Sequence, residues 1–287
     1  MPLDLHLHSW LSDGLPSPTQ VVDHAAEVGL NLIALTDHDT AAGHSEAAAA
    51  ASRESIRLIA GIEMTTVRPN REDDEWHMLG YFVQPDHPTL LAQCADTQRA
   101  LRERLARIIS RLNARGRAVD FSEVDESAPN TEVLDRPHLA RIMLQRGWVE
   151  SFPEAFQRHL GHEGDCFSPL DGPTPEDAIA CIHAAGGIAV LAHPKYVDYP
   201  RGATETDIRA LAEAGLDGLE VHHLGHTPEE VKRYAAIASK LGLIVTGGSD
   251  CHGARQEDGR RPIETCCVPD WIEDQLLERC PEQTAAL

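Results

Sequence analysis

The sequence of 287 residues lacks three features: a C-x-x-C pair among its seven cysteines, an apolar run long enough to cross a membrane, and a signal peptide before its first predicted strand. Unpaired thiols are typical of reduced compartments, and a membrane-spanning helix needs about 20 apolar residues. These absences exclude a disulfide-built scaffold and an integral membrane protein. We expect a soluble, cytoplasmic protein that does not bind a membrane.

Basic residues are also scarce. The chain has 25 lysines and arginines against 46 aspartates and glutamates, which gives a formal net charge of −21. Such a surface repels long polyanions and argues against duplex nucleic acid as a partner. Small anionic substrates remain compatible with it, because bound cations reverse the sign of the charge locally. The absence of a G-x-S-x-G motif argues against a nucleophilic serine.

Short apolar runs alternate with helical patterns along most of the chain. We predict strands over residues 3–8, 30–36, 57–64, 75–83, 188–193, 216–223 and 243–250. Most of them are separated by predicted helices, one opening at Ser17-Pro18 and the others over 41–55, 173–185, 204–214 and 227–241. This alternation favours a parallel α/β arrangement, closed or nearly closed as a barrel, over residues 1–85 and 171–287.

Residues 86–170 break the alternation, and we interpret them as a mostly helical insertion that covers the barrel mouth. Segments 137–147 and 153–160 look helical, and an earlier helix has its apolar positions at helical spacing. Those positions are Leu101, Leu105, Ile108, Ile109 and Leu112. A second face of the same helix carries a stripe of arginines, which we expect to be solvated: Arg104, Arg107, Arg111 and Arg115.

Histidines and carboxylates gather at the ends of the predicted strands. His6 and His8 share one face of the first strand, and Asp250 and His252 share one face at the last, because alternate strand residues point the same way. Active sites of barrel enzymes lie at the C-terminal ends of the strands. His77 is an exception, since it lies near the start of its predicted strand. Imidazole and carboxylate are the usual ligands of Mn, Fe and Zn, so the pattern predicts one metal centre.

In order and approximate spacing, these residues resemble the polymerase and histidinol phosphatase (PHP) family. The matching stretches are His6-Leu-His8 with Asp13, Thr36-Asp37-His38-Asp39, Gly61-Ile62-Glu63, His77, Ala192-His193-Pro194, and Ser249-Asp250-Cys251-His252. The resemblance implies an α/β fold, a distorted seven-stranded (β/α)7 barrel, with three divalent metal ions. It also implies their ligands: His6, His8, Glu63 and Asp250 for the first metal, Glu63, His77 and His193 for the second, and Asp13, His38 and His252 for the third.

The charge of such a centre favours a phosphate ester as substrate. Three divalent cations bring about +6, and the three carboxylates return about −3. The remaining positive charge suits a bridging hydroxide and a phosphate monoester dianion better than a neutral amide. Manganese is the favoured metal, and iron, zinc or cobalt also accept mixed imidazole and carboxylate ligands. Asp37 and Asp39 flank a ligand and are expected to orient it by hydrogen bonds.

Four residues outside the ligand set are candidates for contacting the substrate. Lys195 follows His193 at a strand end, and His222 and His223 end the next strand. Arg136 lies in the insertion, where its guanidinium could bind an anion in bidentate fashion. Departure of a sugar alkoxide benefits from a proton donor, and His223 is our candidate for that general acid.

Within the family, the H-L-H-S-x-x-S-D-G run over residues 6–14 and the Arg136-Pro137-His138 segment resemble the nucleoside 3′,5′-bisphosphate phosphatase group. That group includes proteins described as 5′–3′ exoribonucleases. The leading hypothesis is removal of the 3′-phosphate from a small phosphorylated nucleotide. The alternatives are a 5′–3′ exonuclease on short single-stranded RNA or DNA, a histidinol-phosphate-type phosphatase, an amidohydrolase, and a catalytically silent nucleotide-sensing module.

Overall fold

A single sheet organises the molecule, and its seven strands follow one another in sequence order. The computed structural model describes residues 2–68, 71–197, 200–253 and 268–279. The strands are β1 (Leu3–Leu7), β2 (Leu32–Leu35), β3 (Arg57–Arg68), β4 (Arg71–Tyr81), β5 (Ile188–Leu191), β6 (Gly218–His223) and β7 (Ile244–Gly248). All seven predicted strands are confirmed, with ends that differ by a few residues.

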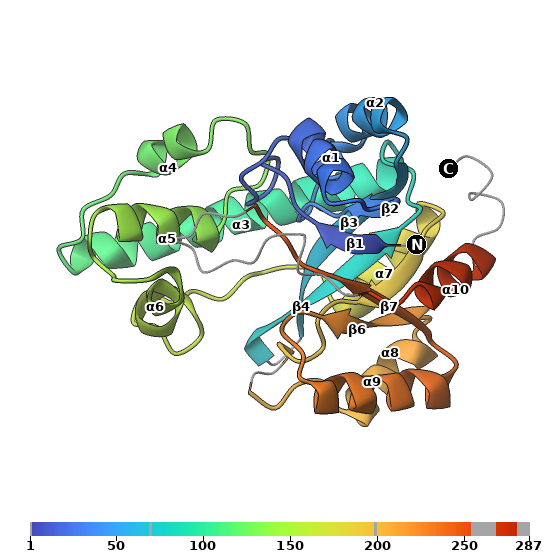
Figure 1. The fold of residues 1–287 in the computed structure, drawn as a ribbon. Coiled ribbons are helices and arrows are strands. Elements are labelled where there is room, and N and C mark those ends of the chain that lie inside the picture. The colour runs from blue at the N-terminus through green and yellow to red at the C-terminus, as the bar shows by residue number, and fades with distance from the viewer. Residues whose placement is uncertain (1, 69–70, 198–199, 254–267, 280–287) are drawn as a thin grey trace.

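The sheet curls until its two edges meet. Just beyond β7, Cys251 pairs with Leu7 of β1 in a parallel bridge, and the His8 amide donates to the Cys251 carbonyl at 2.9 Å. Gly248 permits this approach, because a β-carbon there would overlap that of His6 and lie 2.6 Å from the His6 nitrogen. The result is the nearly closed, distorted α/β barrel that the sequence predicts (Figure 1).

Helices pack around this sheet at the places where the sequence predicts them. They are α1 (Pro18–Glu27), α2 (His44–Glu54), α7 (Pro175–Ala184), α8 (Glu205–Glu213) and α9 (Pro228–Leu241), joined near the C-terminus by α10 (Trp271–Arg279). Four of them begin with a capping box, in which the N-cap hydroxyl and the side chain three residues later exchange hydrogen bonds with the backbone. The four N-cap residues are Ser17, Thr174, Thr204 and Thr227.

Strand β4 departs from the parallel arrangement that the alternation favours. It runs antiparallel to both β3 and β5. Only residues 69 and 70 separate β3 from β4 in the sequence, and so short a link joins antiparallel strands alone. The first half of β4 therefore lies at the end of the sheet where the parallel strands have their C-termini. This direction accounts for the exceptional position of His77, which pairs with Thr65.

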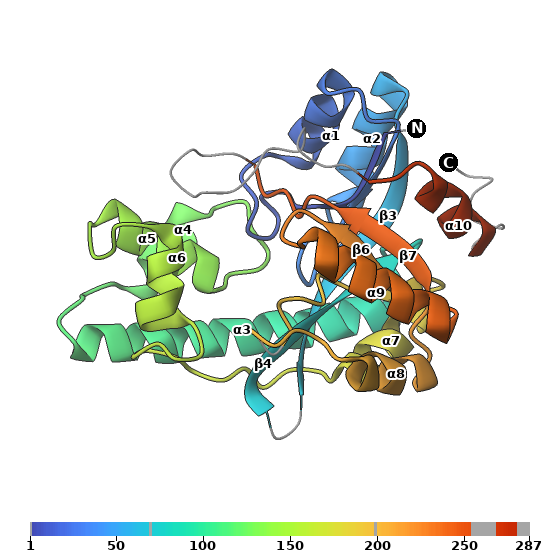
Figure 2. The same ribbon diagram turned by 60° about the horizontal axis from the view of Figure 1, so that its bottom comes forward.

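Residues 86–170 contain α3 (Pro88–Ala114), α4 (Phe121–Ser127), α5 (Arg136–Gln145) and α6 (Phe152–Ala155), which continues into the π-helical turn η1 (Phe156–Leu160). Helices α4 to α6 gather around the far end of α3, away from α1, α2 and α10 (Figures 1 and 2). Leu105, Ile108 and Leu112 of α3 help form a separate apolar core there. Earlier in α3, Leu90 and Cys94 belong to the barrel core instead. Helix α3 thus contributes to both the barrel core and the separate core of the insertion.

The expectation that the α3 arginines are solvated is wrong for Arg104. Its side chain is fully buried, between Glu75 of β4 and Asp135 at the start of α5. Sequence spacing alone could not reveal these partners, which come from distant segments. Among the described residues, no helix combines the length and the apolar character needed to cross a membrane.

Candidate metal centre

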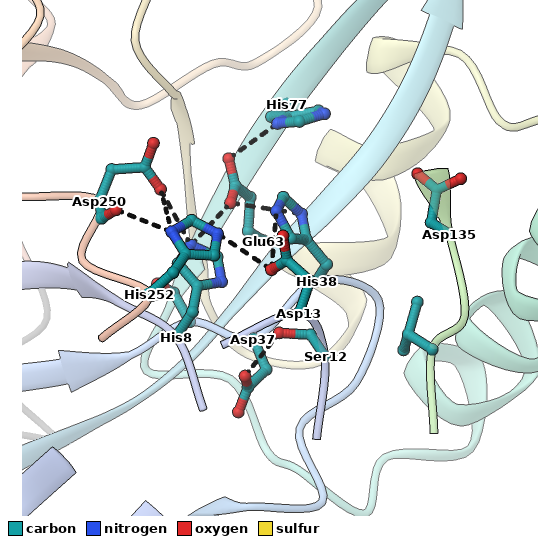
Figure 3. A network of polar contacts seen from close by, with 12 residues as sticks. His8, Ser12, Asp13, Asp37, His38, Glu63, His77, Asp135, Asp250 and His252 are labelled. Carbon is teal, nitrogen blue, oxygen red and sulfur yellow. Dashed lines mark hydrogen bonds and ion pairs between the residues drawn. The ribbon is translucent and has the colours of Figure 1, made fainter. Parts of the chain in front are cut away.

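The structure brings all nine predicted ligand residues together at one end of the sheet. Parallel strands and the loops that follow them supply most of the side chains, and antiparallel β4 supplies His77 from near its middle. Glu63 on β3 lies in the middle of the cluster, with His77 on one side and His8 and His252 on the other (Figure 3). The predicted ligands thus converge at the strand ends, and their role as metal ligands stays a prediction.

The first predicted ligand group is compact, and three of its four members are buried. His6 Nε2 lies 3.0 Å from Glu63 Oε2, and His8 Nε2 lies 3.2 Å from the same oxygen. Asp250 Oδ1 is 3.2 Å from His8 Nε2 and 3.5 Å from His6 Nε2. Four donor atoms thus converge within 4.8 Å of one another, as a single cation requires.

The second group is built on the other oxygen of Glu63. Its Oε1 lies 3.0 Å from His77 Nδ1 and 2.9 Å from His193 Nε2. His38 also approaches, with Nδ1 at 3.4 Å from Glu63 Oε2. Glu63 therefore touches both groups, in keeping with a bridging carboxylate.

The third group lies on the side of the loop after β1. His252 Nε2 is 2.9 Å from Asp13 Oδ1, and His38 Nε2 is 3.9 Å from the same oxygen. The His8 ring stacks on that of His252, with centroids 4.0 Å apart. His8 and His38 thus each lie close to two of the groups. The ligand sets implied by the resemblance assign each of these histidines to one metal only. The assignment of each ligand to a metal stays a prediction.

The protonation chemistry of the cluster fits divalent cations. Burial lowers the pKa of His38 to about 3, and its buried Nδ1 has no hydrogen-bond partner in the described part of the chain. This neutral imidazole offers a lone pair for a metal. Burial alone would also lower the pKa of His8, but the carboxylates of Asp250 and Glu63 raise it to about 9. A cation bound at these carboxylates would take the place of the proton.

Two buried carboxylates that the sequence analysis missed hold the donors in position. Glu220 Oε1 lies 2.9 Å from His6 Nδ1, and its Oε2 accepts the His193 amide hydrogen at 2.7 Å. Asp4 accepts hydrogen bonds from the amides of His6 and Ser249. Bonds of this kind fix the orientation of a ligating imidazole. The signal available in the sequence was a charged residue inside an apolar strand, as in Leu219-Glu220-Val221.

Asp37 and Asp39 were expected to orient the neighbouring ligand, but their side chains instead accept hydrogen bonds from the loop after β1 and from β3. Asp37 accepts hydrogen bonds at 2.7 Å from the Ser9 amide and from the hydroxyls of Ser9 and Ser12, which orders the loop that carries Asp13. Asp39 accepts one from the Thr65 amide at 2.9 Å and has a φ of +48°. A left-handed conformation is uncommon outside glycine and clusters at functional sites.

The candidate substrate residues differ in whether they lie in the cluster of predicted ligands. His223 belongs to the cluster, with Nε2 3.6 Å from Asp250 Oδ2 and its ring 5.6 Å from that of His193. His222 does not, because neighbouring strand residues point to opposite faces. Its ring instead packs edge-on against Trp271 of α10. Lys195 donates to the Gly225 carbonyl at 2.8 Å and lies 3.1 Å from Glu230.

Arg136 is held in a network of four charged groups beside His77. Arg104 contacts Glu75 Oε1 and Asp135 Oδ1, each at 2.7 Å, and Arg136 contacts Glu75 Oε2 at 2.8 Å. Burial would raise the pKa of Glu75 and of Asp135, but the two arginines hold both values below their ordinary range. The carboxylates are therefore ionised, and Arg136 already has an anionic partner.

The insertion also contacts the loop that carries Asp13. Thr131 donates its hydroxyl to the Ser12 carbonyl at 2.6 Å, and the Glu132 amide donates to the Leu11 carbonyl at 2.9 Å. His138 accepts the Asp135 amide hydrogen at Nδ1, and its Nε2 lies 3.1 Å from the Ser12 carbonyl, to which it donates in that tautomer. The insertion is thus linked to the metal face at two places, this loop and β4.

Comparison with known proteins agrees with this geometry. The PHP domain model matches residues 4–151. The chain is 33% identical to a 3′,5′-nucleoside bisphosphate phosphatase of Chromobacterium violaceum, over 94% of this chain and 95% of that protein. It is 36% identical to a 5′-3′ exoribonuclease of Haemophilus influenzae, over 87% and 89%. Among solved structures, a Bifidobacterium adolescentis protein described as a metal-dependent phosphoesterase superposes with a TM-score of 0.87, at 31% identity and over 97% and 96% of the two chains.

Proposed function

The chain belongs to the PHP domain family and is a metal-dependent hydrolase of phosphoesters, and on that premise we propose that it removes the 3′-phosphate from nucleoside 3′,5′-bisphosphates. The products are a nucleoside 5′-monophosphate and inorganic phosphate. The observation that carries the proposal is the convergence of eight imidazole and carboxylate side chains around a ninth, Glu63. We further propose three divalent cations, with manganese favoured.

The chain's own residues have separate tasks in this reaction. His6, His8, Glu63 and Asp250 would hold one cation, and Glu63 would share a second with His77 and His193. Asp13, His38 and His252 would hold the third. When bound, the cations would lower the pKa of water and neutralise the phosphoryl oxygens. Glu220 holds the His6 ring and Asp4 holds the His6 backbone in the position that the first cation would need.

His223 is suited to protonate the departing sugar oxygen. The Gly225 amide donates to His223 Nδ1 at 3.0 Å, so the proton of the neutral ring is on Nε2. That nitrogen faces Asp250 at 3.6 Å, beside the first ligand group. A proton held there is available to a leaving group that departs from the metal face.

The second phosphate of the substrate would lie towards the insertion. Arg136 is the predicted partner, and its contact with Glu75 means that a phosphate must compete with a carboxylate for the same guanidinium. A phosphate would also have to compete for Lys195, because Glu230 and the Gly225 carbonyl already contact its ammonium group. Both residues stay predictions as phosphate contacts.

A second candidate function is a 5′–3′ exonuclease on short single-stranded RNA or DNA. It is favoured by the similarity to the H. influenzae protein named as an exoribonuclease. The net charge of −21 argues against long polymers but not against short ones. The same metal face would serve either reaction.

Assays of phosphate release and of strand cleavage distinguish the phosphatase from the exonuclease. Protein stripped of metal and reloaded with Mn²⁺ is given a nucleoside 3′,5′-bisphosphate, the matching 3′- and 5′-monophosphates, a sugar phosphate and a 5′-phosphorylated trinucleotide. We expect the highest kcat/KM on the bisphosphate. Faster turnover of the trinucleotide would favour the exonuclease, and equal rates on the bisphosphate and the sugar phosphate would refute the proposal.

A further inference from the structure

Tyr196 is an exposed aromatic residue at the edge of the metal centre. Three large hydrophobic side chains are notably exposed in the described part of the chain, namely Leu91, Tyr196 and Trp271. Leu91 lies on α3 and Trp271 on α10, whereas Tyr196 follows β5 by a few residues. Its ring contacts His193 and His223 edge-on, with centroids 5.7 and 5.8 Å away. Of the three, Tyr196 is thus the one that adjoins the predicted ligands.

The position of this ring is fixed by its neighbours. The Tyr196 amide donates to the His193 carbonyl at 2.9 Å, which closes a turn directly after the ligand. Gly225 lies beneath the far end of the ring, where a β-carbon would overlap the Tyr196 hydroxyl and lie 2.9 Å from Cζ. Lys195 holds the Gly225 carbonyl, and the Gly225 amide is bound to His223. An exposed ring held in this way has little conformational entropy left to lose when a ligand packs on it.

We infer that Tyr196 is the surface on which the nucleobase of the substrate stacks, an inference that rests on the proposed function and specifies its substrate class. A phosphate bound at buried ligands must direct its leaving group outward, past the residues at the rim. Tyr196 is 45% exposed at that rim, beside both a predicted ligand and the proposed proton donor. Planar bases of any sequence gain from stacking on an aromatic ring, whereas a bare sugar phosphate does not.

The ring, and not the hydroxyl, is the part of Tyr196 that this role uses. The hydroxyl end is packed at Gly225, on the side of the loop after β6. Tyr196→Phe should therefore behave like the wild type, whereas Tyr196→Leu keeps apolar bulk but loses the aromatic face. Because the side chain is partly exposed, neither change leaves a cavity in the core.

The test compares two substrates that differ only in the base. One is a purine nucleoside 3′,5′-bisphosphate, and the other is the equivalent bisphosphate of 1,4-anhydroribitol, which has no base. We expect Tyr196→Leu to raise the KM of the purine substrate about tenfold, with kcat nearly unchanged and both constants unchanged on the base-free substrate. The control is Trp271→Leu, which changes a similarly exposed aromatic residue on α10. It should alter neither KM nor kcat on either substrate.

Two results would overturn the inference. Equal losses on both substrates would show that the ring only supports His193 and His223, and unchanged KM values would show that no base stacks there. Failure of the proposed function gives a different result, namely wild-type protein that does not prefer bisphosphates to sugar phosphates. The ratio between base-bearing and base-free esters still reports on Tyr196 in that case.

Discussion

Replacing Arg104 by methionine tests whether the charged network beside His77 holds the insertion on the barrel. Methionine has a similar length and packs well in a buried site, so the change removes the charge and five donors with little loss of volume. Glu75 and Asp135 would then lose their contacts of 2.7 Å with the guanidinium. Both carboxylates are largely buried, with 13% and 20% of their side-chain surfaces exposed.

Removing one partner of a buried ion pair costs about 3–5 kcal/mol, because the remaining charge has no compensation. Arg136 still contacts Glu75 at 2.8 Å, so that carboxylate keeps one partner. We therefore expect a loss near the lower end, about 3 kcal/mol in the free energy of unfolding. Arg104→Lys should lie between the wild type and Arg104→Met, because an ammonium keeps the charge but cannot reach both acids as a planar fork does.

Urea unfolding followed by circular dichroism measures this difference, provided that the slope with denaturant is unchanged. The matched control is Arg99→Met on the same helix. Arg99 and its partner Asp96 are 65% and 64% exposed, and such a surface pair contributes about 0–1 kcal/mol. If Arg104→Met costs no more than Arg99→Met, the reasoning about burial is refuted.

Two further predictions concern the metal face. Asp13→Ala should lower the manganese bound per chain, measured by plasma mass spectrometry after reloading, and should slow phosphate release; a full metal content with unchanged turnover would refute the three-metal assignment. His223→Gln should slow the bisphosphate reaction by about 10²-fold or more but spare 4-nitrophenyl phosphate, whose leaving group needs no proton. His222→Gln is the matched control, since that ring packs on Trp271, and equal losses on both esters would exclude His223 as the general acid.

The metal face was predictable from the sequence because the rules that place it are local. Alternation within a strand puts His6 and His8 on one face, and parallel strands bring their C-terminal ends to one edge. The position of His77 could not be predicted in this way, because the direction of β4 depends on how β3 and β4 pair. The end of β3 at Arg68 and the start of β4 at Arg71 are given by the structure, whereas in the sequence the acidic stretch obscured them.

Residues that support the site were harder to predict. Both Glu220 and His223 face the cluster although three positions separate them, an odd spacing that a regular strand does not allow. The pairing of β6 with β7 shifts between Glu220 and His222, and this irregularity restores the common face. A bulge of this kind arises from pairing between strands, so no pattern in β6 alone indicates it.

The excess of acidic residues in this chain conflicts with the binding of an anionic substrate unless bound metal ions compensate the charge at the candidate centre. Glu63, Asp250, Asp13 and Glu220 all lie within or directly behind the ligand cluster, where their charges would repel a phosphate dianion. Among the described residues, the two predicted phosphate contacts, Arg136 and Lys195, are already paired with Glu75 and Glu230. We therefore predict that bound metal ions supply the attraction that offsets these carboxylates. On this reasoning, metal loading favours substrate binding as well as the chemical step.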